Sequence, residues 1–214
     1  MGRIALIETS IVRRRHTRLP CALTAAHTLF VVVLVPTYAR HYGPGNFLWF
    51  SDVALLTSVP ALVFESRLLA STQAVSVLVP ELIWLVDFGA GMAVGKYPIG
   101  LAAYMSDRRI PRFVRALSLF HLWLTPLLVL IVSRTGYDRR AFKYQTMLSA
   151  AVLVASWRLT TPADNVNWVH SWPKRIRPGP ARAGFVLALA AGLSLACYLP
   201  AHLLLKRLFP APRP

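Results

Sequence analysis

The chain has 214 residues, of which 56% are hydrophobic and only 15% charged, and its mean hydropathy is +0.51. A water-soluble domain carries about 25% charged residues, so this composition argues against an ordinary soluble domain. The net charge of +16 comes from basic clusters between apolar segments, without a nucleic-acid recognition module. Such clusters favour lipid headgroups as partners and argue against nucleic acid. They are Arg13–Arg15, Arg108–Arg109, Arg139–Arg140 and Lys174–Arg175.

Two long runs, residues 116–133 and 183–205, contain no Asp, Glu, Lys or Arg. A bilayer core about 30 Å thick needs about 20 such residues in a helix. These runs predict an all-α polytopic membrane protein whose partners include membrane lipids. The expected organisation is a basic N-terminal arm over residues 1–20, a single transmembrane domain over 21–207 and a Pro-rich tail over 208–214.

In chain order, the apolar segments predict six membrane spans. They cover residues 22–38, 47–64, 69–92, 113–133, 143–159 and 183–205. Residues 97–106 are also apolar, but a helix of this length would reach only about 15 Å, half a bilayer. We therefore expect a re-entrant or interfacial segment there, beside a six-span helical bundle. A small excess of Lys and Arg on the N-terminal side predicts a cytoplasmic N terminus.

The second span begins at a turn-forming stretch, Gly43-Pro44-Gly45, and carries two polar residues, Ser51 and Asp52. Glycine allows positive φ and proline fixes its own φ, so the stretch predicts a turn at the membrane surface. Asn46 is expected to cap the following helix by accepting a hydrogen bond from a backbone N–H. Asp52 either complements the positive end of the helix dipole or belongs, with Ser51, to a site.

Three further ionisable residues lie inside predicted spans, where such residues are functional candidates by default. Glu81 follows Pro80 in the third span, and a buried carboxylate there needs a partner: a histidine, a hydroxyl or an arginine. Asp87 lies nearer the end of that span, where a salt bridge with Lys96 or an arginine is expected. His121, in the fourth span, is either a packing residue or part of a site. The other histidines share no ligand spacing with it, so no metal or cofactor is predicted.

Three short segments resemble the YwaF-type bacterial integral membrane family, which is distantly similar to animal membrane acyltransferase and androgen-induced hydrolase proteins. They are Leu48-Trp49-Phe50-Ser51-Asp52-Val53-Ala54-Leu55, Phe120-His121-Leu122, and Asn165-Val166-Asn167-Trp168 before Trp172-Pro173-Lys174. The resemblance implies a location in a bacterial cell membrane and adds Asn165 and Asn167 to the polar candidates. Ser51 stands where the animal acyltransferases are thought to use Cys, which excludes a thiol mechanism here.

The resemblance implies a lipid-active acyl hydrolase or acyltransferase. His121 would take the proton of Ser51, Ser51 would attack a lipid acyl carbonyl, and Glu81 would orient His121. Two alternatives stay open from the residues alone: a small transporter or channel in which Asp52, Glu81 and Asp87 line a polar path, or a membrane scaffold without catalysis. A cavity shared by Ser51 and His121 would favour the enzyme, and acids along a continuous path would favour transport.

Overall fold

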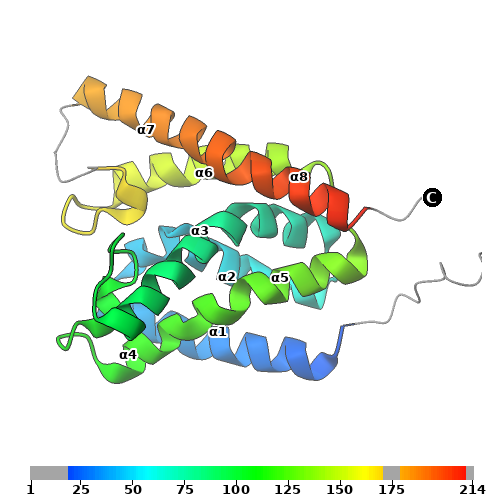
Figure 1. Cartoon of the computed structure of the whole chain (residues 1–214), viewed down its shortest axis with the longest axis horizontal. Helices are drawn as coiled ribbons and strands as arrows, with labels where there is room; N and C mark the ends of the chain where they lie inside the picture. The colour runs from blue at the N-terminus through cyan, green and yellow to red at the C-terminus, as the bar shows by residue number, and fades with distance from the viewer. Residues whose placement is uncertain (1–18, 171–178, 211–214) are drawn as a thin grey trace, which may run out of the picture.

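The computed structural model describes residues 19–170 and 179–210, and Figure 1 shows their arrangement. Most of the predicted N-terminal arm, the Trp172-Pro173-Lys174 stretch and the last residues of the C-terminal tail lie outside the described residues. Within the described ranges the chain is all-helical and has no strands, as predicted. The helices are α1 (Cys21–His41), α2 (Phe50–Val63), α3 (Arg67–Val94), α4 (Arg112–Leu117), α5 (His121–Thr135), α6 (Ala141–Leu159), α7 (Gly179–Leu193) and α8 (Leu199–Leu208).

Short irregular turns join some of these helices end to end, so that the described chain forms six long helical segments. α4 continues through the 3-10 helix η4 (Ser118–Phe120) into α5. α7 continues through the π-helical turn η6 (Ser194–Tyr198) into α8. The six segments lie at the positions predicted for the six spans.

Four segments are long and apolar enough to cross a membrane: Cys21–His41, Arg67–Val94, Arg112–Thr135 and Arg182–Leu208. The other two, α2 and α6, differ from the predicted spans. α2 has 14 residues and is about 21 Å long, which is shorter than a bilayer core. α6 has 19 residues, but the polar residues of its sequence make it less apolar than the four candidate spans.

Large apolar side chains point outward from several helices. Leu29 of α1, Val86 of α3 and Leu187 of α7 are each about two-thirds exposed, with values of 65%, 65% and 71%. Monomeric soluble proteins rarely expose contiguous apolar surface of this kind, whereas lipid tails cover it. Together with the four candidate spans, this surface is that of an integral membrane protein.

α3 is the central helix and packs against α2, α5, α6 and α8. Residues 70–77 are buried without interruption, because neighbouring helices cover α3 on every side there. Their serines satisfy polar groups of the neighbours: Ser71 Oγ accepts the Asp138 N–H, and Ser76 Oγ accepts from Gln145 Nε2, each at 2.9 Å. Small residues in such a helix let other helices approach closely, which places α3 at the centre of the bundle.

Three connections gather at one end of the bundle, opposite the end where α1 begins and α8 ends (Figure 1). They are residues 42–49 between α1 and α2, 95–111 between α3 and α4, and 160–170 after α6. We call this end the loop end. Because each connection approaches the same helix termini, side chains far apart in the sequence meet there.

Residues 97–106 fold against the end of α3 instead of forming a span, and they finish in the 3-10 helix η3 (Ala103–Ser106). The Asp87 carboxylate anchors them by accepting three backbone N–H hydrogen bonds. The donors are Ile99 and Ala102 at 2.8 Å and Gly100 at 3.2 Å. The expected salt bridge of Asp87 is therefore wrong: the amides occupy both carboxylate oxygens, and no described residue forms an ion pair with it.

Candidate functional site

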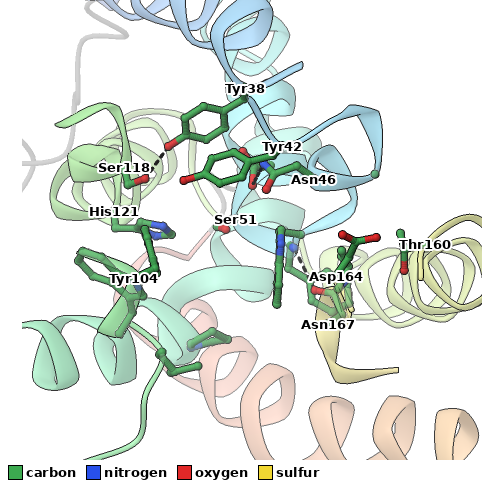
Figure 2. Close-up of a pocket in the computed structure, with 18 of the residues that line it drawn as sticks. Tyr38, Tyr42, Asn46, Ser51, Tyr104, Ser118, His121, Thr160, Asp164 and Asn167 are labelled. Atoms are coloured by element: carbon green, nitrogen blue, oxygen red, sulfur yellow. Dashed lines mark hydrogen bonds between the residues drawn. The ribbon is translucent and has the colours of Figure 1, made fainter. Parts of the chain in front are cut away.

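A cavity of about 660 Å³ opens at the loop end, and Figure 2 shows many of its lining residues. Ser51 and His121 both line it, as predicted, together with Asp52, Glu81 and Asn167. The other lining residues with hydroxyl, amide or carboxyl groups are Tyr38, Tyr42, Asn46, Tyr104, Ser118, Thr160 and Asp164. α1, α2, α3, η4, α5 and all three connections of the loop end contribute side chains.

His121 and Glu81 form a buried hydrogen-bonded pair in the cavity wall. His121 Nδ1 lies 2.7 Å from Glu81 Oε2, a hydrogen bond whose donor depends on the tautomer of the imidazole. The two residues are 9% and 2% exposed. The prediction that Glu81 is buried and paired, with a histidine among the expected partners, is confirmed. With the proton on Nδ1, the Nε2 atom is free to accept another.

The imidazole ring of His121 is held between two aromatic rings. Trp84 and Phe120 stack on it with ring centroids 4.3 and 4.2 Å away, at interplanar angles of 21° and 25°. Trp84 lies three residues after Glu81 on α3, so one face of that helix supplies both the carboxylate and a stacking ring. Phe120 immediately precedes His121 at the junction of η4 and α5. Stacking and hydrogen bonding together fix the orientation of the imidazole.

A second hydrogen bond holds the start of α5 in place. The Tyr38 hydroxyl and Ser118 Oγ lie 2.6 Å apart and join the end of α1 to η4, as Figure 2 shows. Both residues are buried. Because His121 follows η4 directly, this bond positions it relative to α1.

The entrance to α2 differs from the prediction. The expected turn is present, with Gly43 at φ +81°, but a 3-10 helix, η2 (Pro44–Leu48), follows it. Asn46 lies inside η2 and does not cap α2; its Nδ2 donates instead to Asp52 Oδ2 at 3.4 Å. α2 itself begins at Phe50, without a cap from the side chain that precedes it.

Asn167, which lies 117 residues after Phe50 in the sequence, forms hydrogen bonds with the backbone at the start of α2. Its Oδ1 accepts the Phe50 N–H at 3.4 Å, and its Nδ2 donates to the Leu48 carbonyl oxygen at 2.7 Å and to Ser156 Oγ at 3.1 Å. Its φ is +51°, a backbone conformation that asparagine tolerates better than most residues. One side chain therefore ties the loop after α6 both to α6 and to the start of α2.

We expect Asn167→Gly to lower the free energy of unfolding by about 2 kcal/mol, because the Leu48 carbonyl and the Phe50 N–H lose their partner. Glycine accepts the positive φ, so this loss contains no backbone strain in the folded state. Asn167→Ala should lose about 1 kcal/mol more, because alanine is strained at this φ. Unfolding in mixed micelles, followed by circular dichroism, measures both values. Equal stability of Asn167→Gly and wild type would contradict the proposed role of the Asn167 hydrogen bonds in joining the loop to the start of α2.

Two other polar residues shape the same loop. Asn165 Oδ1 accepts the His170 N–H at 3.0 Å, and Asn165 does not line the cavity. Asp164 does line it, and its Oδ2 accepts from the Thr161 hydroxyl at 2.7 Å and from the Thr161 N–H at 3.2 Å. These two hydrogen bonds lower the pKa of Asp164, so its carboxylate is ionised at neutral pH.

Ser51 and Asp52 lie in the first turn of α2 with different degrees of exposure. Ser51 is half-buried, and its hydroxyl makes no hydrogen bond to another described residue, His121 included. Asp52 is buried, and Asn46 is its hydrogen-bond partner. Asp87, the remaining predicted acid, does not line the cavity. The structure thus brings Ser51, Asp52 and His121 to one cavity and separates Asp87 from them.

Sequence reasoning missed several hydroxyl groups of the cavity, among them Tyr38, Tyr42, Tyr104 and Ser118. Tyrosines near span ends are ordinary interfacial anchors, so no local pattern distinguishes these from others. Burial raises the pKa of both Tyr42 and Tyr104, which keeps their hydroxyls protonated at neutral pH. They can therefore donate hydrogen bonds within the cavity.

The chain matches no protein-family model, no curated protein and no solved structure. In the described part of the chain, no group of three or more His, Cys, Asp or Glu side chains is arranged to hold a metal ion. The chemistry of the site is therefore inferred from its own residues.

Proposed function

We propose that this protein is a membrane-embedded acyl hydrolase or acyltransferase that acts on lipids, with His121 as its general base. The observation that carries the proposal is the buried Glu81–His121 pair beside a cavity that Ser51 also lines. A carboxylate that accepts the Nδ1–H of a histidine orients the ring and leaves Nε2 as a base for a nearby hydroxyl. The resemblance to the YwaF-type family agrees with this chemistry.

In the proposed reaction, His121 Nε2 takes the proton of Ser51 as Oγ attacks the carbonyl carbon of an acyl ester. The ester C–O bond then breaks, and the alcohol leaves with the proton that His121 returns. Water or a second lipid hydroxyl attacks the acyl-serine, gives its proton to His121, and releases the acid or the new ester. Ser51 regains its proton in this step. Glu81 stays ionised and stabilises the imidazolium that forms twice.

The surroundings of the pair support a lipid substrate. The cavity volume lies within the range of small-molecule sites, about 300–1,000 Å³. Apolar side chains such as Val77 and Ile110 form parts of its wall. Trp49 and Trp168 form an edge-to-face pair at the loop end, with ring centroids 5.8 Å apart, and tryptophan favours the membrane interface. A lipid acyl ester, which lies at that depth, would meet Ser51 there.

For the location we propose a bacterial cell membrane with a cytoplasmic N terminus, on the basis of the family resemblance and the distribution of basic residues. The loop end lies opposite the start of α1 (Figure 1). With this orientation, the cavity would open on the outer side of the membrane. Its lipid substrate would then come from the outer leaflet.

A transporter or channel has less support than an enzyme. Of its three expected acids, Asp87 is bound to backbone amides, which leaves Asp52 and Glu81 in the cavity. Leu55 of α2 and Leu128 of α5 are fully buried in the apolar core of the bundle. The scaffold alternative is decided by the experiment below.

A fluorophosphonate probe tests the proposal without knowledge of the substrate, because a serine that a base activates forms a covalent bond to its phosphorus and releases fluoride. With the protein in lipid nanodiscs, we expect labelling at Ser51. Labelling should fall by about a hundredfold or more in Ser51→Ala and in His121→Ala. Intact-mass spectrometry and peptide mapping measure the adduct.

Ser133→Ala is the matched control, because Ser133 lies on α5 outside the cavity and its hydroxyl donates to the Leu130 carbonyl within the helix. It should be labelled as the wild type is. Hydrolysis of a short-chain nitrophenyl ester gives a second readout of the same variants. An unlabelled wild type, or Ser51→Ala with full labelling and full esterase activity, would refute the serine mechanism.

A further inference from the structure

The charge of the cavity lining is opposite to that of the whole protein. The carboxyl groups of Asp52, Glu81 and Asp164 line the cavity, and no lysine or arginine of the described residues does. His121, the basic side chain that lines it, is already paired with Glu81. The chain as a whole carries a formal charge of +16. Such a lining attracts a cation into a protein whose overall charge repels one.

Of the three carboxylates, Asp52 is the least compensated. Glu81 and Asp164 each have a hydrogen bond of 2.7 Å. Asp52 is 4% exposed, its Oδ1 has no hydrogen-bond partner, and its Oδ2 has the single long bond of 3.4 Å from Asn46. An ionised carboxylate with so few partners is costly to bury, so Asp52 holds a proton unless a cation in the cavity compensates its charge. A ligand with a positive charge and an N–H or polarised C–H group would supply Asp52 with both a counter-charge and a hydrogen-bond donor.

Aromatic rings line the same cavity as Asp52. Tyr42 lies beside Asn46 in Figure 2, and its ring contacts Tyr38 edge to face with centroids 5.2 Å apart. Tyr42 and Asp52 both line the cavity, and Asn46, the hydrogen-bond partner of Asp52, lines it as well. Trp49 also lines the cavity. Faces of such rings attract an ammonium group within about 6 Å of the centroid.

We propose that Asp52 and these rings bind the ammonium group of a cationic amphiphile, a primary or quaternary amine carried on an apolar chain. The carboxylate pairs with the charge, the rings add cation–π attraction, and the apolar wall accommodates the chain. A headgroup that contains phosphate fits poorly, because the lining offers no lysine or arginine to neutralise it. A neutral headgroup leaves Asp52 uncompensated.

The role of this amine as the substrate rests on the function proposed above, since its acyl carbonyl would have to reach Ser51 and His121. Binding itself needs no catalysis. Asp52→Asn should therefore weaken binding of the amine whether or not Ser51 is catalytically active. The two proposals can fail independently, because one is measured by covalent labelling and the other by affinity.

The test is a titration of the purified protein, in an uncharged maltoside detergent, with dodecyltrimethylammonium. Trp49, Trp84 and Trp168 line the cavity, so tryptophan fluorescence reports binding. We expect saturable binding at least about tenfold tighter than that of dodecyl sulfate or dodecylphosphocholine, which have the same chain. Because the net charge of the protein favours the sulfate, a preference for the ammonium reports the cavity.

Asp52→Asn removes the charge and keeps the shape, and it should weaken ammonium binding about tenfold or more. Asp107→Asn is the matched control, because Asp107 pairs with the exposed Arg109 and lies outside the cavity. Trp49→Leu, which retains Asp52, should weaken binding about threefold. Equal affinity of Asp52→Asn and wild type, or a wild type that prefers the sulfate or the phosphocholine, overturns the proposal. If Asp52→Asn does not fold, unchanged affinity in Trp49→Leu overturns it.

Discussion

Replacing Glu81 by Gln is expected to lower kcat for acyl ester hydrolysis about a thousandfold while the helices stay folded. In the proposed mechanism the Glu81 carboxylate, 2.7 Å from His121 Nδ1, accepts the Nδ1–H and so keeps Nε2 unprotonated. An amide can donate to Nδ1 instead, which moves the ring proton to Nε2 and removes the base. Glu81 does not touch the reacting atoms, so it is a positioning residue whose loss falls on kcat and leaves KM nearly unchanged.

Two further variants separate this role from a structural one. Glu81→Asp, which restores the charge, should recover part of the lost rate, and the Glu81→Gln/His121→Ala double variant should be no slower than His121→Ala alone. Glu65→Gln is the matched control, because Glu65 accepts the Leu19 N–H at 2.8 Å, away from the cavity, and should leave kcat unchanged. Additive losses in the double variant would show that Glu81 does not act through His121.

The largest effect on stability is expected from Asp87→Leu, which should lower the free energy of unfolding by about 3 kcal/mol or more. The substitution keeps the approximate volume but leaves the amides of Ile99, Gly100 and Ala102 without their acceptor. Each such amide costs about 1–3 kcal/mol when it stays buried, and charge-assisted bonds are at the strong end. Residues 97–106 should detach from α3, which proteolysis at the loop end would reveal.

Asp107→Asn is again the control, because its carboxylate forms an exposed ion pair with Arg109, a kind of pair that contributes little. Unfolding in mixed micelles should show no change for this variant. A stability loss of the same size in Asp107→Asn and Asp87→Leu would mean that any acid at this end is needed, and not the specific bonds of Asp87.

Local patterns in the sequence predicted the helices well, because an apolar segment about 20 residues long identifies a span by its own composition. The boundaries of α1, α3 and the segment at 112–135 follow the predicted spans closely. The same reasoning predicted that Glu81 is buried and paired, since a carboxylate amid apolar residues needs a partner. It named histidine, hydroxyl and arginine as candidate partners, and the mechanism implied by the resemblance selected His121 as the residue that Glu81 would orient.

The predictions that depended on nearby partners were wrong where the true partner comes from another connection. The sequence predicts that Asn46 caps α2, but the side chain that binds the start of α2 is that of Asn167. It also predicts that Asp87 pairs with a charged side chain, but backbone amides bind its carboxylate. No pattern in the residues near Asn46 or Asp87 indicates either partner.

The sequence by itself therefore determined the helical membrane class, the positions of the helices and the need of each buried polar group for a partner. The tertiary structure alone decided which groups meet, because hydrogen bonds depend on distances of about 3 Å between segments that only the packing of the bundle brings together. The cavity at the loop end is the clearest case. Its His121–Glu81 pair spans 40 residues of sequence, and its Asn167 contact with Phe50 spans 117.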